Sequence, residues 1–522
     1  MKKILIANRG EIAVRIARAC RELDIAPVAV YSDCDRAALH VRHADEAYAI
    51  GGSAPRDSYL RIDRIVEAAR KSGADAVHPG YGFLAEHEGF AQAVRDAGLT
   101  FIGPTPEAIG LMGQKTAARA AAGRAGVPVV PGTDDPVPAD ISDAHLEALA
   151  RGIGYPVLVK AVSGGGGKGM RTVLDPADLG GAVRAARSEA DSAFGDAAVY
   201  LERRLGRPRH IEVQVLGDAH GTVLPFVERE CSIQRRHQKV VEETPSVAVT
   251  LELRQAMAAA AATVARAVGY TSAGTVEFLL GDDGRYFFLE MNTRLQVEHA
   301  ITEMVTGIDL VQWQIRIARG ERLDLDPLAL LAPKGHAIEC RIYAEDPDNT
   351  FLPSPGRLLA LRVPAGPGIR DDGGVAVGDH IPTFYDPMIS KLVAWAEDRP
   401  RAIARMRRAL GEYVVAGIRT TVPFFVWLLD QPAFADGQVH TTFLDEVLAS
   451  RQGRPFVEPT PDLEEVAVMA GALQSLLSPP GPRSHENGVR PLFDGRWKER
   501  ARVEGLRGLE RREGWSWRAP GD

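Results

Sequence analysis

Two glutamates and a polar run near the middle of the chain have the residue types and spacing of a metal-binding and acid–base site. Residues 275–299, TVEFLLGDDGRYFFLEMNTRLQVEH, contain two apolar runs around the turn GDDG at 281–284. This pattern predicts a β-hairpin. With a four-residue loop, Glu277 would face Phe288, and Glu290 would lie diagonally from Glu277 on the same sheet face, about 7–8 Å away. Two carboxylates on one face can share a divalent cation.

The polar residues that follow the hairpin recur with a period of two: Asn292, Arg294, Gln296 and Glu298. In an extended chain these side chains would point to the same side, so an amide, a guanidinium and a carboxylate would converge near the hairpin glutamates. The alternative is a hairpin whose solvated face is simply polar. The spacing alone leaves both interpretations open.

The composition is that of a globular protein and argues against several other classes. The 522 residues are 45% hydrophobic and 25% charged with a net charge of −7, so nucleic acid is not an expected partner. Four scattered cysteines lack metal-ligand spacing and are typical of reduced thiols in the cytoplasm. No apolar run is long enough for a signal peptide or a membrane span, so we expect a cytoplasmic protein of roughly three or four domains.

The first 113 residues alternate between apolar strand patterns and amphipathic helix patterns. Strands are expected at residues 3–7, 27–31, 75–78 and 100–102, with helices at 12–23 and 59–71. This alternation predicts a doubly wound parallel sheet. In such sheets ligands bind beyond the carboxyl ends of the strands, where the loops NRGE (8–11) and HPGYGFLAE (78–86) fall. The alternative for each loop is a plain structural turn.

A glycine-rich loop opens the second domain, which we place at residues 114–333. The predicted strand 155–161 includes Lys160 and is followed by SGGGGKGM at 163–170. Because a strand and not a helix is expected next, the loop does not fit a dinucleotide fingerprint, and no Lys-Ser or Lys-Thr pair makes it a Walker loop. We therefore interpret it as a flexible loop over nucleotide phosphates, within a mobile lid of about residues 132–204. A simple linker is the alternative.

Three further segments complete the domain organisation. The run CSIQRRHQKVVEE at 231–243 concentrates basic residues and is either a wall for an anionic substrate or a solvated face. A third domain is expected at 334–447, beginning with the strand HAIECRIY that carries Arg341. Residues 448–522 form a tail with one expected helix at 462–477, and this tail is either a docking arm or partly disordered.

These motifs, in this order, resemble those of the biotin carboxylase component of biotin-dependent carboxylases, an ATP-grasp enzyme. The similarity covers residues 1 to about 447 and rests on KILIANRGEIAVRI, HPGYGFLAE, FIGPTPEAI, SGGGGKGM, RHIEVQVLGD, ECSIQRRHQKVVEE, FLEMNTRLQVEH, ECRIYAEDP and FLPSPG. It implies an α/β fold with an N-terminal Rossmann-like domain, an ATP-grasp domain and a C-terminal biotin carboxylase domain.

The resemblance also implies a role for each candidate site residue. ATP phosphates would be held by Lys115, Lys160 and the loop glycines Gly164, Gly165, Gly166 and Gly167. The rest of the nucleotide would contact Met170, Glu202, Leu205, His210, Gln234, His237 and Leu279. Mg²⁺ or Mn²⁺ would be bound by Glu277, Glu290 and Asn292, and bicarbonate by Lys239, Arg294, Gln296 and the backbone of Val297. Glu298 would be the general base, Arg341 would stabilise the biotin enolate, and Tyr81 would contact biotin.

The implied reaction is the first half-reaction of an acyl-CoA carboxylase, such as acetyl-CoA carboxylase in fatty acid biosynthesis. Bicarbonate attacks the γ-phosphate of ATP to give carboxyphosphate, whose breakdown delivers CO₂ to the biotin ureido nitrogen. The implied partners are a biotin carboxyl carrier protein, a second copy of this chain in a homodimer, and a carboxyltransferase subunit. Biotin is expected on the separate carrier, because the only Met-Lys pair in this sequence is Met1-Lys2.

Some positions depart from the family pattern, and two other functions stay open. Arg203 stands where many members have a lysine beside adenine. Arg18, Glu22 and Arg370 match the dimer face, but Pro367 stands where an aromatic residue is expected. Another ATP-grasp carboxylate–amine ligase would share the glycine loop and the metal hairpin, but not the ECRIYAEDP strand. A non-catalytic ATP-binding scaffold subunit would not need the full set of catalytic residues present here.

Overall fold

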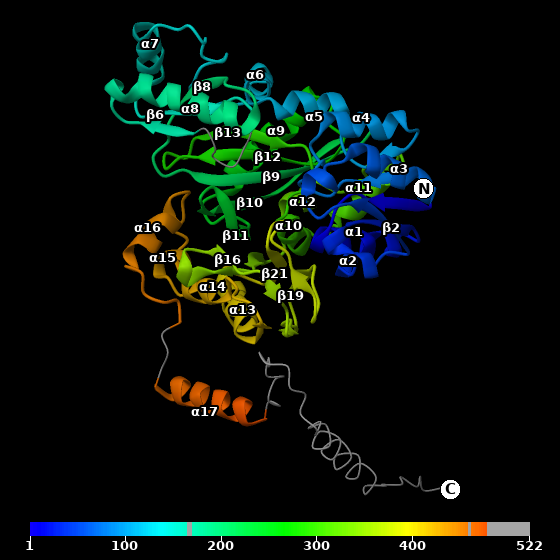
Figure 1. The fold of residues 1–522 in the computed structure, drawn as a ribbon. Helices are drawn as coiled ribbons and strands as arrows, with labels where there is room; N and C mark the ends of the chain where they lie inside the picture. The colour runs from blue at the N-terminus through cyan, green and yellow to red at the C-terminus, as the bar shows by residue number, and fades with distance from the viewer. Residues whose placement is uncertain (164–169, 458–460, 478–522) are drawn as a thin grey trace, which may run out of the picture. The chain divides into compact units, whose positions relative to one another are not determined.

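A parallel five-stranded sheet forms the N-terminal part of the chain in the computed structural model, which describes residues 1–163, 170–457 and 461–477 (Figure 1). The strand order is β3-β2-β1-β4-β5. The strands are β1 (Lys3–Ile6), β2 (Ala26–Ser32), β3 (Glu46–Gly51), β4 (Ala76–His78) and β5 (Thr100–Phe101). The predicted doubly wound sheet is confirmed. β3 was not predicted, because its sequence EAYAIG has few β-branched residues.

Helices cover both faces of this sheet. They are α1 (Gly10–Glu22), α2 (Leu39–Arg42), α3 (Ile62–Ser72), α4 (Glu88–Asp96) and α5 (Pro106–Gly113). The apolar face of α1 shares a core cluster with Ile4, whereas α3 and α4 share another with Leu5, which points to the opposite face. The two predicted ligand loops lie side by side, because the Asn8 side chain donates hydrogen bonds of 2.7 Å to the carbonyls of Pro79 and Tyr81.

A small antiparallel sheet of order β7-β6-β8 follows. Its elements are α6 (Lys115–Arg124), α7 (Asp143–Ile153), β6 (Val157–Ala161), β7 (Arg171–Val173), α8 (Leu179–Phe194) and β8 (Val199–Arg203). The strands predicted on both sides of the glycine loop are confirmed, whereas the loop residues Gly164–Gly167 lie outside the described residues. Within the described structure, residues 126–132 make two isolated bridges and no strand, because Pro128 and Pro131 have no N–H to donate.

An eight-stranded antiparallel sheet of order β13-β12-β9-β10-β11-β14-β21-β19 forms the middle of the chain. Its strands are β9 (Arg209–Gly217), β10 (Val223–Arg235), β11 (Gln238–Thr244), β12 (Ser272–Leu280), β13 (Tyr286–Asn292), β14 (His336–Tyr343), β19 (Ile369–Gly373) and β21 (Met388–Ala396). The strand predicted for HAIECRIY is confirmed as β14. Its pairing with β11, in which Val241 lies opposite Cys340, carries the sheet across the boundary predicted at residues 333 and 334. The second and third predicted domains therefore share one sheet.

Side chains alternate along β9 and β12 between an apolar face and a polar face. Val213 and Val276 share a core cluster with Met257 of the alanine-rich helix α9 (Leu251–Ala267). Glu212 and Glu277, each one residue away, point to the opposite face. The helices α10 (His299–Thr306), α11 (Leu310–Ala318) and α12 (Pro327–Leu331) lead from this sheet towards β14.

The predicted hairpin forms from β12 and β13, but its register differs from the prediction. Glu277 lies directly opposite Glu290 and not opposite Phe288. The reason is a longer loop, closed by a hydrogen bond between Gly281 and Arg285, together with a bulge next to Glu277. The two carboxylates therefore share a face, as expected, but as a direct cross-strand pair.

The C-terminal region closes the compact part of the chain. Its helices are α13 (Arg399–Glu412), α14 (Val422–Leu429), α15 (Pro432–Ala435) and α16 (Phe443–Ser450), and its short strands are β15 (Glu345–Asp346), β16 (Leu352–Pro353), β17 (Gly356–Arg357), β18 (Ala360–Arg362), β20 (His380–Ile381) and β22 (Val414–Ala416). Phe456 packs against Phe424 and Trp427, so this part extends to Val457 and not to residue 447. The tail helix expected at 462–477 is confirmed as α17 (Pro461–Leu477) and belongs to a second unit. Among the described residues, no helix has the length and apolar character to cross a membrane.

Candidate active site

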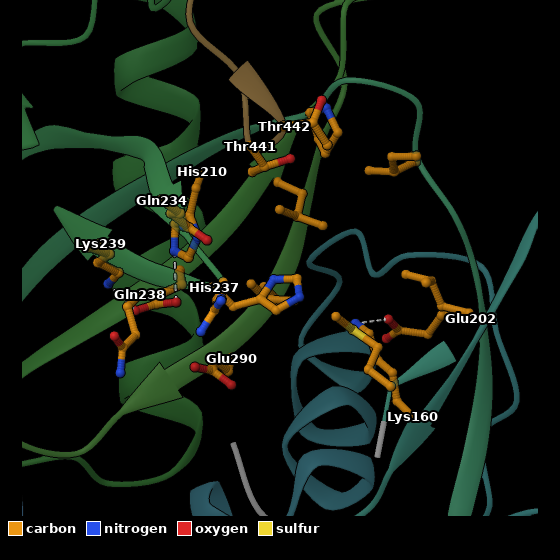
Figure 2. Close-up of a pocket in the computed structure, with 18 of the residues that line it drawn as sticks. Lys160, Glu202, His210, Gln234, His237, Gln238, Lys239, Glu290, Thr441 and Thr442 are labelled. Carbon is orange, nitrogen blue, oxygen red and sulfur yellow. Dashed lines mark hydrogen bonds and ion pairs between the residues drawn. The ribbon is translucent and has the colours of Figure 1, made fainter. Parts of the chain in front are cut away.

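A cleft of about 640 Å³ lies between the small sheet and the polar face of the large sheet (Figure 2). Lys160 of β6 and Glu202 of β8 line one side, and His210 of β9 and Lys239 of β11 line the other. A space of this size accommodates a ligand as large as a nucleotide. The cleft is therefore the candidate active site.

Most of the predicted site residues in the described part of the chain line this cleft. They are Lys115, Lys160, Met170, Glu202, Leu205, His210, Gln234, His237, Lys239, Glu277, Leu279, Glu290, Asn292, Arg294, Gln296, Val297 and Arg341. Glu298 has no exposed surface and lies directly beneath, in contact with Lys239 and Arg341. Tyr81 does not line the cleft, and its ring centre lies 5.8 Å from the Lys391 ammonium.

The ammonium of Lys239 lies among three carboxylates. It contacts Glu212, and it lies 2.9 Å from Glu277 Oε1 and 2.9 Å from Glu298 Oε1. Burial disfavours the charged lysine, but the three carboxylates outweigh burial and raise the pKa of Lys239 well above its usual range. Lys239 is therefore a cation at neutral pH.

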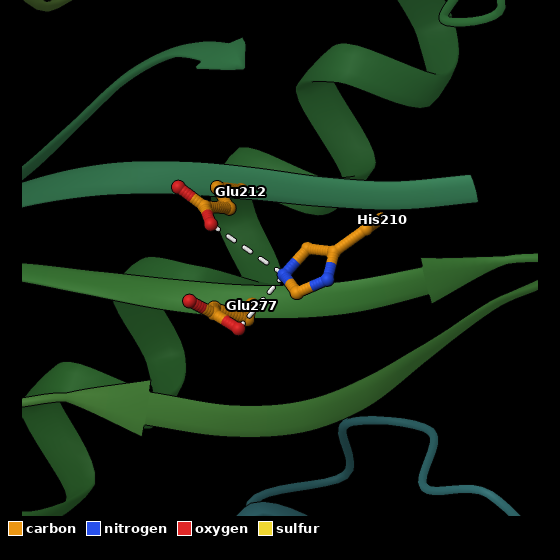
Figure 3. A group of neighbouring side chains, drawn as sticks. All are labelled: His210, Glu212 and Glu277. Atoms are coloured by element: carbon orange, nitrogen blue, oxygen red, sulfur yellow. Dashed lines mark ion pairs between the residues drawn. The ribbon is translucent and has the colours of Figure 1, made fainter. Parts of the chain in front are cut away.

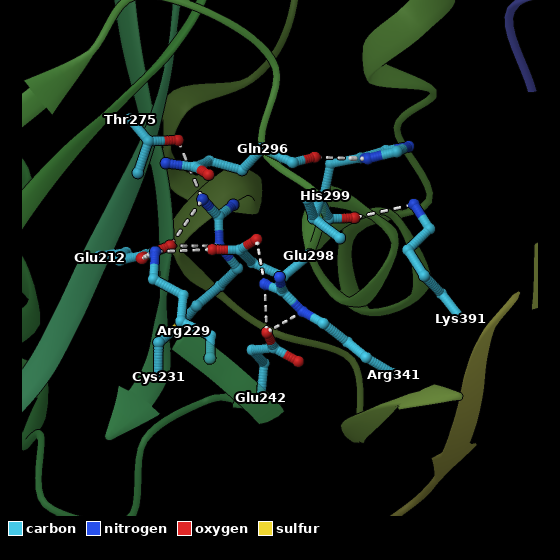
Figure 4. Close-up of polar contacts among 12 residues, drawn as sticks. Glu212, Arg229, Cys231, Glu242, Thr275, Gln296, Glu298, His299, Arg341 and Lys391 are labelled. Carbon is cyan, nitrogen blue, oxygen red and sulfur yellow. Dashed lines mark hydrogen bonds and ion pairs between the residues drawn. The ribbon is translucent and has the colours of Figure 1, made fainter. Parts of the chain in front are cut away.

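Arg341 of β14 joins Glu298 to Glu242 (Figure 4). Its Nη2 lies 3.0 Å from Glu298 Oε2, and its Nε donates a hydrogen bond of 2.7 Å to Glu242 Oε1. Burial and Glu212 disfavour the charged form of Glu298, but Lys239 and Arg341 outweigh them and lower the pKa of Glu298. Glu298 is thus an ionised carboxylate whose two oxygens contact two different cations.

A fully buried arginine, Arg229 of β10, supports this cluster from below (Figure 4). Its guanidinium donates hydrogen bonds of 3.2 Å to Glu212 Oε2 and 2.9 Å to Thr275 Oγ1. Neither Arg229 nor Glu212 is among the site residues predicted from the sequence. The signal available for Glu212 is the alternation His210, Glu212, Gln214 in the motif RHIEVQVLGD, which marks a polar face within an otherwise apolar segment.

Three glutamates form a row across neighbouring strands: Glu212 of β9 lies opposite Glu277 of β12, which lies opposite Glu290 of β13. Within the described structure Glu290 makes no hydrogen bond or ion pair, and burial together with Glu277 raises the pKa of Glu290. Asn292 donates a hydrogen bond of 2.7 Å to Glu277 Oε1. Since a divalent cation would offset the repulsion between the two carboxylates, the donor set of Glu277, Glu290 and Asn292 fits Mg²⁺ or Mn²⁺.

A second group of donors lies beside this pair, formed by His210, Glu212 and Glu277, whose donor atoms lie within 4.8 Å of one another (Figure 3). His210 Nε2 lies 2.8 Å from Glu277 Oε2 and 3.4 Å from Glu212 Oε1. Burial disfavours the charged imidazole, but the two carboxylates outweigh it and raise the pKa of His210 to about 10. The His210 imidazolium and the Lys239 ammonium already compensate the charges of Glu212 and Glu277. A metal cation therefore fits better beside Glu290, which has no such partner among the described residues.

The other wall of the cleft presents two lysines. Lys160 contacts Glu202, which also accepts a hydrogen bond of 2.5 Å from Arg119. Lys115, at the start of α6, makes no ion pair in the described part of the chain, and burial lowers the pKa of Lys115 although Glu290 opposes the shift. An ammonium that faces a cleft without a partner suits an anionic ligand such as phosphate.

The segment after β13 bends and does not continue as the extended chain that the alternation predicts. β13 ends at Asn292, and Glu86 of the HPGYGFLAE loop accepts a hydrogen bond of 2.8 Å from Arg294 Nε. Gln296 donates a hydrogen bond of 3.2 Å to Glu277. The polar side chains converge as expected, but contacts with a distant loop bring them together. Glu86 is a further residue that the sequence analysis does not single out.

Five residues that follow residue 333 also line the cleft without having been predicted: Tyr343, Asp386, Thr441, Thr442 and Asp445. Tyr343 lies in β14, Asp386 in the loop before β21, Thr441 and Thr442 just before α16, and Asp445 in the first turn of α16. Single polar residues in loops carry no spacing signal. The last three reach the cleft because the chain, after forming the large sheet, folds back against it.

Three family models match the chain in succession. The biotin carboxylase N-terminal domain matches residues 1–109, the carbamoyl-phosphate synthase L chain ATP-binding domain matches residues 114–326, and the biotin carboxylase C-terminal domain matches residues 339–446. The fold, the cleft and these matches define an enzyme of the ATP-grasp class.

The chain is similar to named proteins over most of its length. It is 53% identical over 445 residues to a pyruvate carboxylase subunit of Methanothermobacter thermautotrophicus, covering 85% of this chain and 89% of the relative. It is 52% identical over 447 residues to the biotin carboxylase of Nostoc sp., covering 85% of this chain and 99% of the relative. The chain belongs to the biotin carboxylase family.

Solved structures of this family have the same fold. A biotin carboxylase–β-γ-ATP complex from Campylobacter jejuni has a TM-score of 0.82 at 45% identity and covers 85% of this chain and 98% of that one. The biotin carboxylase domain dimer of the Hydrogenobacter thermophilus 2-oxoglutarate carboxylase, in complex with MgADP, ADP and bicarbonate, has a TM-score of 0.83 at 46% identity and covers 88% of this chain and 99% of that one.

Proposed function

We propose that this chain carboxylates biotin with ATP and bicarbonate, as a subunit of a biotin-dependent carboxylase. The observation that carries the proposal is the position of Glu298, a buried and ionised carboxylate between Lys239 and Arg341 beneath a cleft of nucleotide size. The Hydrogenobacter relative was solved with MgADP and bicarbonate, which supports the same pair of ligands here.

We assign the nucleotide to the space between the two sheets. Its phosphates are assigned to Lys115 and Lys160 with the loop Gly164–Gly167, and the rest of the nucleotide to Met170, Glu202, Leu205, His210, Gln234, His237 and Leu279. Glu277, Glu290 and Asn292 are the residues that would hold Mg²⁺ or Mn²⁺. When bound, this ion neutralises charge on the phosphoryl group that is transferred.

We assign bicarbonate to the polar end of the cleft, where Lys239, Arg294, Gln296 and the backbone of Val297 meet. Charged donors of this kind bind a small anion strongly. Glu298 takes the bicarbonate proton while the bicarbonate oxygen attacks the γ-phosphate of ATP, which gives carboxyphosphate and ADP. The two cations beside Glu298 keep it ionised and ready to accept that proton.

We assign Arg341 to the second step. Carboxyphosphate breaks down to CO₂ and phosphate, and the phosphate takes the proton of the biotin ureido nitrogen. Arg341 stabilises the negative charge that develops on the biotin enolate, which then attacks CO₂. Tyr81 is assigned to a contact with biotin, and its loop is joined to the cleft by the Glu86 contact with Arg294.

The partners follow from the chemistry of the second half-reaction. We place biotin on a separate carrier protein, and we place transfer of the carboxyl group to an acyl-CoA on a carboxyltransferase chain. We propose a homodimer through the face that carries Arg18, Glu22 and Arg370, supported by the dimer of the Hydrogenobacter relative. The four free cysteines are compatible with the cytoplasm, where we propose that the enzyme acts.

Glu298→Gln tests the proposal in two assays, bicarbonate-dependent ATP cleavage and carboxylation of free biotin. Loss of the base should lower both rates by about 100-fold or more. The affinity for ATP should not change, because Glu298 lies beneath the bicarbonate end. The matched control is Glu321→Gln on the surface, which should leave both rates as they are. Normal rates in Glu298→Gln would refute the assigned role.

A further inference from the structure

A lysine without exposed surface lies behind the bicarbonate end of the cleft. The side chain of Lys391 on β21 is 0% exposed, and its ammonium lies 3.4 Å from Glu11 Oε1 and 3.9 Å from Asp372 Oδ2. Glu11 is the last residue of the NRGE motif and lies in the first turn of α1, and the proposed function assigns no ligand to this motif. Desolvation of a buried ammonium is costly, so the groups that Lys391 contacts should explain why it is there.

The shortest of these contacts is with residues 296–298, the segment that carries Glu298 and is called the catalytic segment below. Lys391 Nζ donates a hydrogen bond of 2.8 Å to the carbonyl oxygen of Val297. His299, which is also 0% exposed, holds the preceding peptide group, because its Nδ1 lies 2.8 Å from the carbonyl oxygen of Gln296. Two successive peptide groups are thus held from behind the cleft by buried side chains (Figure 4).

These carbonyl contacts determine the direction of the Val297 N–H. A trans peptide is planar with its C=O and N–H antiparallel, so a Gln296 carbonyl directed at His299 turns the Val297 N–H away from His299. Val297 lines the cleft, whereas His299 does not. With the residues that the structure describes, the Val297 N–H makes no hydrogen bond. It is therefore a donor available at the cleft.

The protonation state of His299 agrees with this arrangement. Burial, together with the nearby Lys391 charge, lowers the pKa of His299 to about 3, so the ring is neutral at physiological pH. A carbonyl oxygen can only accept, so the proton of the neutral ring is on Nδ1. In the described part of the chain Nε2 has no hydrogen-bond partner. The nearest charged group to Nε2 is Glu303, whose Oε2 lies 4.0 Å away, so the contact with Gln296 is the shorter polar contact of this ring.

We propose that Lys391 and His299 are positioning residues that align the Val297 N–H with bicarbonate, and that Glu11 of the NRGE motif holds Lys391 in place. This inference rests on the proposed function, because that function assigns bicarbonate to Val297. The N-terminal domain then has a part in the reaction, since Glu11 fixes the catalytic segment through Lys391.

Lys391→Met removes the ammonium and retains the length of the side chain. The KM for bicarbonate in ATP cleavage should rise by about 10- to 100-fold, as when a buried group that orients a ligand is lost, whereas ATP affinity in equilibrium titration should not change. The matched control is Arg254→Met, which removes a buried ion pair with Glu228 on the α9 side of the sheet. This control should leave the KM for bicarbonate unchanged.

Two further comparisons separate positioning from stability. His299→Asn keeps an N–H donor near the position of Nδ1 and should retain the wild-type KM for bicarbonate, whereas His299→Leu should raise it by about tenfold or more. The double variant Glu11→Gln with Lys391→Met removes both charges of the pair, so neither is left buried without its partner. It should keep the wild-type melting temperature and still show the raised KM.

The outcomes distinguish this inference from the proposed function. Absence of bicarbonate-dependent ATP cleavage in the wild-type chain would refute the proposed function. With an active wild type, an unchanged KM for bicarbonate in Lys391→Met and His299→Leu would overturn the positioning role. An equal rise of the KM for ATP would also overturn it, as would an equal rise of the KM for bicarbonate in Arg254→Met, because general loss of structure would then explain the effect.

Discussion

Lys239 contacts three buried carboxylates and Arg341 contacts two. Buried ion pairs of this kind contribute little net stability, because the cost of desolvation offsets the attraction between the charges. Their effect here is chemical, since they keep Glu298 ionised beside the cleft. At the scale of single residues, the site is a cluster of paired charges. An anion that binds there can replace a carboxylate as a partner of Lys239.

Glu290→Gln tests the metal assignment at this scale. Metal-dependent ATP cleavage should fall by about 10- to 100-fold and require more Mg²⁺, because one of two carboxylate ligands is lost. The melting temperature of the metal-free protein should not fall, because the variant removes the repulsion between Glu290 and Glu277. Mg²⁺ titrations of ATP cleavage provide the measurement. Asp283→Asn in the exposed turn of the same hairpin is the control, and a normal Mg²⁺ response of Glu290→Gln would rule out the metal role.

Arg341→Ser separates the two halves of the reaction. Bicarbonate-dependent ATP cleavage should remain measurable, whereas carboxylation of biotin should fall much further, because the guanidinium is needed when charge develops on biotin. The two rates are compared in the same preparation. Equal losses in both would instead mean that Arg341 acts by holding Glu298 and Glu242. Arg235→Ser, which breaks a pair with Glu345, is the control for loss of a half-buried arginine.

At the scale of elements, the loop after β19 contacts the first turn of α1, where the NRGE motif ends. A Cβ on Gly374 would lie 2.4 Å from the Glu11 backbone nitrogen. Gly374→Ala should therefore displace Glu11, lower the melting temperature and raise the KM for bicarbonate. Gly411→Ala in α13 is the matched control, because a Cβ there meets no atom within 4 Å. It should be neutral or stabilise the protein by up to about 1 kcal/mol.

A buried ion pair ties β11 to β14 and α13, and it predicts a dependence of stability on pH. Glu243 contacts His336 at 2.8 Å and Arg399 at 2.6 Å. Burial disfavours the charged carboxylate, but these partners outweigh it and lower the pKa of Glu243 from 4.5 to about 2. The stabilisation is therefore complete above the unfolded value of 4.5 and is lost as the pH falls towards about 2.

Glu243→Gln should lower the free energy of unfolding at neutral pH by about 3 kcal/mol. Its difference from the wild type should stay constant down to about pH 5 and become smaller below that. Urea unfolding followed over this pH range provides the measurement. Glu397→Gln, in an exposed pair with Arg401, should show no such difference at any pH. A constant difference between Glu243→Gln and the wild type down to about pH 3 would contradict the assigned linkage.

At the scale of the whole molecule, the compact part ends at Val457. A chain that ends there should keep the melting temperature of the full chain and its activity on free biotin, while losing any assembly that the tail supports. A chain that ends at Ser450 should be less stable, because it lacks Arg451, which lies 3.4 Å from the Phe456 ring centre, and Phe456 itself. Thermal unfolding and assays of both truncations provide the test. Equal stability of the two would show that Phe456 contributes nothing to the core.

The sequence by itself determined the local elements and the residue types of the site. The glycine boundaries and alternation of residues 275–292 predict the β12–β13 hairpin, and the apolar alternation of residues 336–343 predicts β14. These signals are local, because turn residues restrict the backbone and the period of two sets the direction of each side chain. Motif spacing, through the resemblance to the family, also identified residues of which most line the cleft.

Only the tertiary structure decided the register of the hairpin and the contacts that hold residues 296–298. The direct pairing of Glu277 with Glu290 depends on a bulge, and the positions of Arg229, Glu86 and Lys391 depend on packing between distant segments. A single polar residue in a strand or loop has no spacing signal that names its partner. Its partner is settled when the whole core packs, because each buried charge then needs an opposite charge or a ligand, and each buried N–H needs an acceptor.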